Sequence, residues 1–143
     1  MKLVDSNVWL ALVLRAHQHH EVASEWFGTQ AASNVALCRA TQMAILRLLT
    51  TNAVLDAYDS EPLTNEQALA LIDGLLTNSR VSFAPEPAGL DAHWRRFAGK
   101  DSPSPKLWMD AYLAAFAVAG NHELVSVDAA FRQFDGLSLR LLV

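Results

Sequence analysis

The chain has a single cysteine, Cys38, among its 143 residues. One cysteine cannot form an internal disulfide and has no second thiolate with which to share a structural zinc ion, so disulfide-stapled scaffolds and zinc fingers are excluded. Long apolar runs are also missing. The longest candidate, from Leu107 to Ala119, contains Asp110 and falls short of the ~20 residues of a membrane span. We therefore expect no membrane segment.

Positive charge is scarce as well. Lys and Arg number 11 against 15 Asp and Glu, which gives a formal net charge of −4. Domains that hold nucleic acid by bulk electrostatics usually carry a basic face. Any nucleic-acid substrate would therefore have to be held locally, by bound cations and a few basic side chains, and Lys100 with the nearby Lys106 supplies local positive charge.

Several common signals are absent from the sequence. It contains neither a Walker-type phosphate loop nor a Rossmann glycine fingerprint, and no serine, cysteine or histidine nucleophile constellation is apparent. The first residues lack the basic region, apolar stretch and small-residue cleavage site of a signal peptide, so we expect a cytoplasmic protein.

What is present is an ordinary globular composition, with 52% hydrophobic and 18% charged residues. A chain of this length buries roughly two-thirds of the surface that its unfolded form exposes, and we expect residues 1–143 to form one domain. Short apolar runs alternate with helical patterns. This order predicts a three-layer α/β/α fold with a central, mostly parallel sheet of about five strands and right-handed crossovers.

The predicted elements follow from apolar periodicity and from turn residues. Thr64 and Gln67 have capping-box spacing. We predict Ser104 to be the cap of a later helix and Pro105 to lie in its first turn. Strands are predicted at 3–4, 35–37, 80–84, 123–127 and 137–143, helices at 6–16, 21–32, 64–76, 89–97, 105–119 and 129–134, and an exposed connection at 52–63.

Asp5 stands where the first strand ends and a helix beginning near Ser6 takes over. In open α/β sheets, ligands bind outside the carboxyl ends of the strands, where helix amino termini also point. Asp5 is therefore a candidate metal ligand, with Asn7 two residues later as a polar neighbour. The alternative is that Asp5 only caps the helix.

Two further aspartates have notable positions. Asp110 is the only charged residue in an otherwise apolar or aromatic stretch from Leu107 to Ala119. Because burying an unpaired carboxylate costs several kcal/mol, we expect Asp110 either to lie in a cleft near a cation or simply to face solvent. Asp128 follows the fourth strand as Asp5 follows the first, and Ser126 stands two residues before Asp128.

Two other groups of residues invite interpretation. Gln42 shares a helical face with Ile45 and Leu49, so we expect its amide to point inward. His17, His19 and His20 suggest a metal site, but they lack the i, i+4 spacing of ligands on one helical face. We interpret the histidines as a solvated turn and helix start.

Asp5, Asp110 and Asp128 should border one crevice. Their mutual repulsion would raise their pKa values unless cations lie between them. Magnesium takes one or two carboxylates, waters and substrate phosphate oxygens, and such a site suits phosphodiester hydrolysis, in which the metal activates water and stabilises the charge that develops on the phosphate.

Four segments, in this order, resemble the PIN-domain family, and within it the VapC-type toxins of bacterial toxin–antitoxin pairs. They are LVDSNVWL at 3–10, TQMAILRLLT at 41–50, DAYLAA at 110–115 and LVSVDAAF at 124–131. Each motif is short, but together they span essentially the whole chain. The resemblance implies a PIN-like fold.

The resemblance also implies an endoribonuclease that depends on Mg²⁺ or Mn²⁺. Asp5 and Asp110 would be metal ligands and Asp128 would complete the acidic, catalytic cluster, with Asn7 and Ser126 at the supporting polar positions. It further implies an RNA substrate, a homodimer, and a small antitoxin whose carboxyl-terminal segment occupies the cleft.

One position departs from the family pattern. The family's usual second acid, a glutamate early in the helix after the second strand, aligns with Gln42. An amide oxygen can contact a metal or a water but adds no charge, so Gln42 is either a tolerated variant or the mark of a weakened or inactive nuclease.

Three other readings of the chain remain open. One is a phosphohydrolase with Asp5 as covalent nucleophile, although Asn7 stands where such enzymes have a second aspartate. Another is a receiver domain, although this chain lacks the paired acids after the first strand and the late lysine that such domains have in their site. The third is a module whose cleft only captures a peptide.

Overall fold

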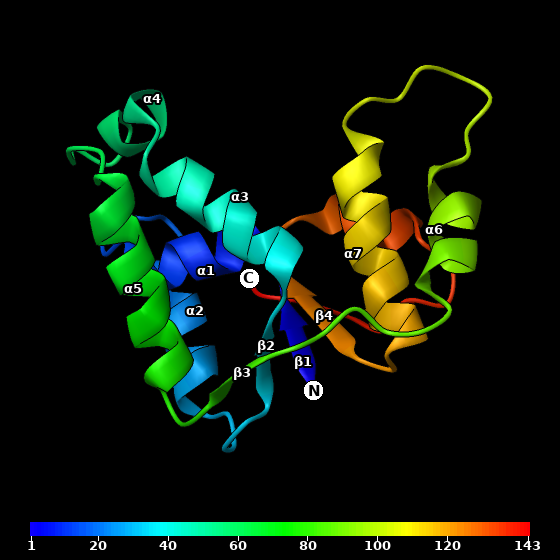
Figure 1. The fold of residues 1–143 in the computed structure, drawn as a ribbon, viewed down its shortest axis with the longest axis horizontal. Helices are drawn as coiled ribbons and strands as arrows, with labels where there is room; N and C mark the ends of the chain where they lie inside the picture. Colours follow the sequence, from blue (N-terminus) through cyan, green and yellow to red (C-terminus); the bar gives the residue numbers. More distant parts are fainter.

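A computed structural model describes residues 1–143 (Figure 1). Thirteen short elements, including one 3₁₀ helix (η1), follow one another along the chain. They are β1 (Lys2–Val4), α1 (Ser6–Val13), α2 (His20–Gly28), β2 (Val35–Leu37), α3 (Arg39–Leu49), α4 (Asn52–Asp56), α5 (Asn65–Thr77), β3 (Val81–Phe83), α6 (Leu90–Ala98), α7 (Leu107–Ala119), β4 (Glu123–Ser126), η1 (Ala129–Gln133) and β5 (Leu139–Leu141).

The five strands form one sheet in the order β3-β2-β1-β4-β5, and every neighbouring pair is parallel. The chain adds β2 and β3 on one side of β1 and then returns to add β4 and β5 on the other side. The winding therefore reverses between β1 and β4. In sheets of this kind, ligands bind beyond the carboxyl ends of the two strands at such a switch point.

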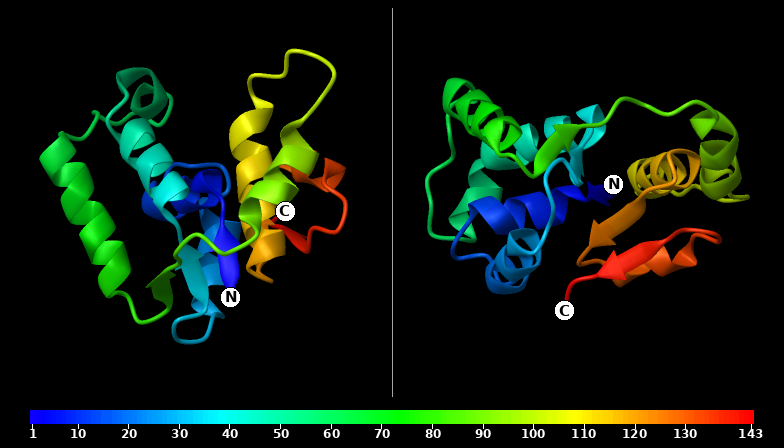
Figure 2. Two further views of the ribbon diagram at one scale, coloured as in Figure 1. Left: turned by 45° about the vertical axis from the view of Figure 1, so that its right-hand side comes forward. Right: turned by 90° about the horizontal axis from the view of Figure 1, so that it is seen from below.

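Helices cover both faces of the sheet. Alternate strand residues point to opposite faces, so Leu3 and Leu124 pack against α6, α7 and η1, whereas Val4 and Val125 pack against α1, α2, α3 and α5. Figures 1 and 2 show α5 on one side of the strands and α6 with α7 on the other. The predicted three-layer α/β/α fold with a five-stranded parallel sheet is confirmed.

Two helices are shorter than predicted. The first ends at Val13 because Leu14 adopts an extended conformation. The second ends at Gly28, where the hydroxyl of Thr29 and the amide of Gln30 both donate to the carbonyl of Trp26 and terminate the helix.

The segment 52–63 is not only the exposed connection that its polarity predicts. It contains α4, whose Leu55 is 1% exposed. The Tyr58 ring that follows stacks on His17, with ring centroids 5.2 Å apart. His17 is therefore buried rather than solvated, and this burial lowers the pKa of its imidazole. The prediction for His17 was wrong because its aromatic partner is distant in the sequence.

The two predicted helix starts have different outcomes. Thr64 and Gln67 form the expected capping box, with each side chain accepting the other residue's backbone N–H. By contrast, α7 begins at Leu107 rather than at Pro105. The Ser104 hydroxyl does not cap it, because this hydroxyl contacts Ser102 and only the Ser104 carbonyl accepts the Leu107 N–H. None of the helices is both long and apolar enough to cross a bilayer.

Candidate active site

The register of β1 and β4 places Asp5 beside Ser126. Leu3 pairs with Leu124 and Val4 with Val125, so the next residues along the two strands come together at the switch point. Asp5 and Ser126 continue the alternation of Leu3 and Leu124 and therefore face α7. The Ser126 hydroxyl donates a hydrogen bond of 2.9 Å to Asp5 Oδ2 and accepts one of 3.0 Å from the Asp128 N–H. One buried hydroxyl thus links two of the predicted acids.

The Asp5 carboxylate is not used as a helix cap. Asp5 occupies the residue before α1, and its backbone carbonyl accepts the N–H groups of Val8 and Trp9, but its side chain makes no capping bond. The side chain is 5% exposed. Burial, together with repulsion from Asp110 and despite the hydrogen bond from Ser126, raises the pKa of Asp5 to about 6. The capping alternative is therefore wrong for this carboxylate.

Asp110 reaches the same region from the first turn of α7. This helix packs closely on the sheet through small buried residues, including Ala111, Ala114 and Ala117. Asp110 is half-buried, and its pKa is raised by burial and by the negative charge of Asp128. The carboxylates of Asp5, Asp110 and Asp128 therefore form a chain in which neighbouring charges repel.

No basic side chain neutralises these acids. The ion pairs in the structure involve Glu123 and Asp91, and none includes Asp5, Asp110 or Asp128. Asp128 is exposed, and its Oδ1 accepts the Ala130 N–H at 2.9 Å, which caps η1. Uncompensated carboxylates beside a buried one form a donor set that suits a hard divalent cation.

The site offers few protein ligands, and magnesium requires few. No three His, Cys, Asp or Glu side chains lie close enough together to enclose one ion. Magnesium needs only one or two carboxylates, because waters and phosphate oxygens complete its shell. Asp5 and Asp110, whose charges already interact, meet that requirement.

The two remaining predicted residues form no hydrogen bond with Asp5, Asp110 or Asp128. Asn7 is exposed on α1 and its side chain makes no hydrogen bond within the protein. Gln42 does not point fully inward as predicted. It is half-buried, and its Oε1 accepts a hydrogen bond from the guanidinium of Arg39. The buried stripe of α3 runs through Thr41, Ile45 and Leu49, so Gln42 stands beside it.

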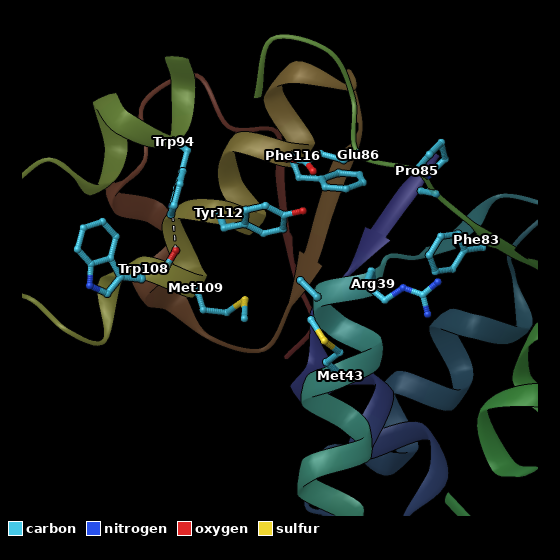
Figure 3. A pocket seen from close by; sticks show the side chains of 12 residues that line it. Arg39, Met43, Phe83, Pro85, Glu86, Trp94, Trp108, Met109, Tyr112 and Phe116 are labelled. Atoms are coloured by element: carbon cyan, nitrogen blue, oxygen red, sulfur yellow. Dashed lines mark hydrogen bonds between the residues drawn. The ribbon is translucent and has the colours of Figure 1, made fainter. Parts of the chain in front are cut away.

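An apolar groove between α3 and α7 was not predicted from the sequence. Met43 from α3 and Met109 from α7 point into it, and the Arg39 guanidinium lies over the Phe83 ring, 5.0 Å from its centroid (Figure 3). Met43, Phe83, Trp108 and Met109 are four of the seven exposed large hydrophobic side chains of the protein. Contiguous exposed apolar surface of this kind is typical of interaction sites.

The aromatic wall of this groove is fixed by a hydrogen bond between α6 and α7. Trp94 Nε1 donates to the carbonyl of Trp108 at 3.1 Å (Figure 3). Burial, with the Glu86 carboxylate nearby, raises the pKa of Tyr112 to about 12, so its phenol stays neutral. The sequence signal for the groove was weak, because its side chains come from four separate segments.

Replacing Ser126 tests the link between the two strands. Ser126→Ala removes the donor to Asp5 and the acceptor of the Asp128 N–H, and we expect it to lower the free energy of unfolding by about 1–3 kcal/mol. Activity should fall about 10–100-fold, the usual cost of losing a group that orients a metal ligand. Chemical denaturation and rate measurements check both effects.

Ser79→Ala is the matched control, because Ser79 is exposed and its hydroxyl makes no hydrogen bond. Equal stability and activity of Ser126→Ala and Ser79→Ala would contradict the bridging role of Ser126.

The fold defines an α/β protein whose parallel sheet carries a cluster of aspartates at its switch point, beyond the carboxyl ends of β1 and β4. The sequence profile of the PIN domain matches residues 2–137, and the chain belongs to the PIN-domain family. The resemblance seen in the four sequence motifs is thereby confirmed.

The chain is similar to Ribonuclease VapC41 of Mycobacterium tuberculosis, with 53% identity over 144 aligned positions that cover 99% of both chains. Among solved structures, it resembles DNA-bound VapBC from Salmonella typhimurium, with a TM-score of 0.69, 15% identity and coverage of 99% and 98%. It also resembles VapC20 of M. tuberculosis, titled a sarcin-ricin loop cleaving toxin, with a TM-score of 0.68, 15% identity and coverage of 98% and 99%. These two structures support the fold.

Proposed function

We propose that this protein is an endoribonuclease that hydrolyses RNA phosphodiester bonds with the help of Mg²⁺ or Mn²⁺, and that it is the toxin of a toxin–antitoxin pair. The observation that carries the proposal is the buried Asp5 carboxylate, which lies beside Asp110 at the switch point without any basic partner. The 53% identity to a ribonuclease over the full chain supports the substrate class.

Each polar residue has a role in this proposal. Asp5 and Asp110 would hold the ion, and Asp128 would complete the cluster as a further acid that adds negative charge. Ser126 orients Asp5 through its 2.9 Å hydrogen bond. Asn7 and Gln42 would offer amide groups to water or substrate. A bound divalent ion activates water and stabilises charge that develops on the phosphate.

Gln42 bears on how strongly ions bind. With an amide in place of a carboxylate, this side of the site contributes no negative charge, so we propose one well-bound ion rather than two. The Gln42 Oε1 instead accepts a hydrogen bond from Arg39 of the same helix. We interpret Gln42 as a tolerated variant of an active nuclease.

We further propose that the protein acts in the cytoplasm as a homodimer and that a small antitoxin inhibits it by placing its carboxyl-terminal segment in the cleft. Several similar structures are titled as VapBC assemblies, among them those from Salmonella typhimurium, Rickettsia felis and Haemophilus influenzae. The exposed side chains of Met43, Phe83, Trp108 and Met109 supply apolar surface for contacts with protein.

The test is an RNA cleavage assay with the purified protein. We expect single-stranded RNA to be cut in the presence of Mg²⁺ or Mn²⁺, and cutting to stop when a chelator is added and to resume when the ion is restored. Asp110→Asn should be inactive while its circular dichroism spectrum stays that of the wild type. Cleavage that persists in chelator, or in Asp110→Asn, would refute the mechanism.

A further inference from the structure

A second, polar cavity lies on α7 beside the acidic cluster. It is lined by Asp110 and Leu107 from α7, by Gln133 at the end of η1, and by four residues of the segment before α7, namely Lys100, Ser102, Ser104 and Lys106. Its volume is about 420 Å³, which is within the range of cavities that hold small ligands. Because Asp110 belongs both to this cavity and to the acidic cluster, the two sites adjoin.

Lysine is concentrated in this cavity. The chain has only three lysines, and Lys100 and Lys106 are two of them. Lys2, the third, pairs with Glu123 at 2.9 Å. Lys100 and Lys106 are exposed and form no ion pair, even though Asp101 and Asp110 are near them in the sequence or in the cavity. Their charges are therefore available to a ligand.

The lining favours a phosphate over an apolar peptide. Leu107 is the one hydrophobic residue in it, and the remaining groups are two ammonium groups, two hydroxyls, one amide and one carboxylate. The groove that also borders the start of α7 is lined mainly by hydrophobic side chains. In a protein with a net charge of −4, two free lysines next to the acids are a local electrostatic contact for a polyanion.

We propose that this cavity binds a backbone phosphate of single-stranded RNA next to the phosphodiester bond that is cut, and that Lys100 and Lys106 are positioning residues that set where the strand crosses Asp110. The inference rests on the proposed ribonuclease function. It adds a substrate contact outside the acidic cluster.

The test measures binding apart from cleavage. A fluorescently labelled single-stranded RNA is titrated with protein in chelator, between 50 and 200 mM salt by design, and its anisotropy is recorded. For Lys100→Gln/Lys106→Gln we expect the Kd to rise about tenfold and the slope of log affinity against log salt to fall by about 0.7, because the contact to one phosphate of a single strand is lost. In cleavage assays, KM should rise more than kcat falls.

Two variants serve as controls. Lys100→Arg/Lys106→Arg keeps both charges and should retain the wild-type slope. Arg15→Gln/Arg47→Gln removes the same net charge from exposed residues that do not line the cavity, and it should also leave the slope unchanged.

Three results would overturn the inference. If the glutamine variant binds RNA as the wild type does while the wild type still cleaves RNA, the phosphate site is wrong and the proposed function stands. If the glutamine variant keeps its RNA affinity but loses affinity for a polyglutamate peptide, the cavity binds acidic protein instead. If wild-type protein neither binds nor cleaves RNA, the proposed function fails together with the inference.

Discussion

Asp5→Asn should abolish RNA cleavage and at the same time stabilise the metal-free protein. Loss of a charged ligand at the reacting centre is expected to slow cleavage on the order of 10³-fold. The gain in stability arises because burial raises the pKa of Asp5 from 3.8 to about 6, so ionised Asp5 costs the folded state up to about 3 kcal/mol at neutral pH. For a chain of this size, that corresponds to a melting temperature higher by roughly 10 °C.

The sign of the pH dependence follows from the same pKa. Between about pH 4 and pH 6, folded Asp5 retains a proton that unfolded Asp5 has lost. The folded state then binds more protons, so the free energy of unfolding contributed by Asp5 falls as the pH rises through this window. The destabilisation is complete above about pH 6 and absent below about pH 4. Asp5→Asn should lack this component.

Thermal denaturation in chelator, over a series of pH values, checks the prediction. Ser126 can donate to the carbonyl oxygen of an asparagine as it does to Asp5 Oδ2, so the variant keeps this hydrogen bond. Asp56→Asn is a suitable control because Asp56 is exposed at the end of α4. A melting temperature of Asp5→Asn at or below that of the wild type at pH 7 would show that ionised Asp5 does not destabilise the folded state.

Divalent cations should raise the melting temperature of the wild-type protein. The repulsion between Asp5 and Asp110, and between Asp110 and Asp128, is relieved when an ion binds the folded state. At an ion concentration one hundred times the Kd, the stabilisation is about 2.7 kcal/mol, or roughly 5–10 °C. Thermal scans with Mn²⁺ or Mg²⁺, each compared with chelator, measure the shift without any RNA.

Variants of the cluster separate specific binding from a general salt effect. Asp5→Asn and Asp110→Asn should lose most of the shift, and Asp56→Asn should keep it. Gln42→Glu should bind the ion at least as tightly as the wild type, since it restores the carboxylate of the family pattern. A shift of the same size in Asp5→Asn, Asp110→Asn and the wild type would mean that the ions bind elsewhere.

The positions of the candidate acids could be predicted because they depend on local patterns. Asp5 and Asp128 each follow a short apolar run, and the rule that ligands collect at the carboxyl ends of parallel strands applies to both. Asp110 was conspicuous because its neighbours in the sequence are apolar. The capping box at Thr64 and Gln67 was also predictable, because all of its partners lie within four residues.

Other features depend on contacts between distant segments. The orientation of Gln42 was mispredicted because it lies beside the buried stripe of α3 and its partner is Arg39. His17 was mispredicted because Tyr58 covers it. The role of Asp5 was ambiguous until Ser126, 121 residues away, proved to be its hydrogen-bond partner.

By itself, the sequence determined the order of the strands and of the helices other than α4, the parallel α/β architecture and the three aspartates, because periodicity and strand ends are properties of neighbouring residues. Only the tertiary structure decided that Asp5 is buried with a raised pKa, that one hydroxyl joins β1 to β4, and that a lysine-lined cavity adjoins Asp110. These features arise from desolvation and charge interactions among groups that are distant in the sequence. They come together only when β1 pairs with β4 at the switch point.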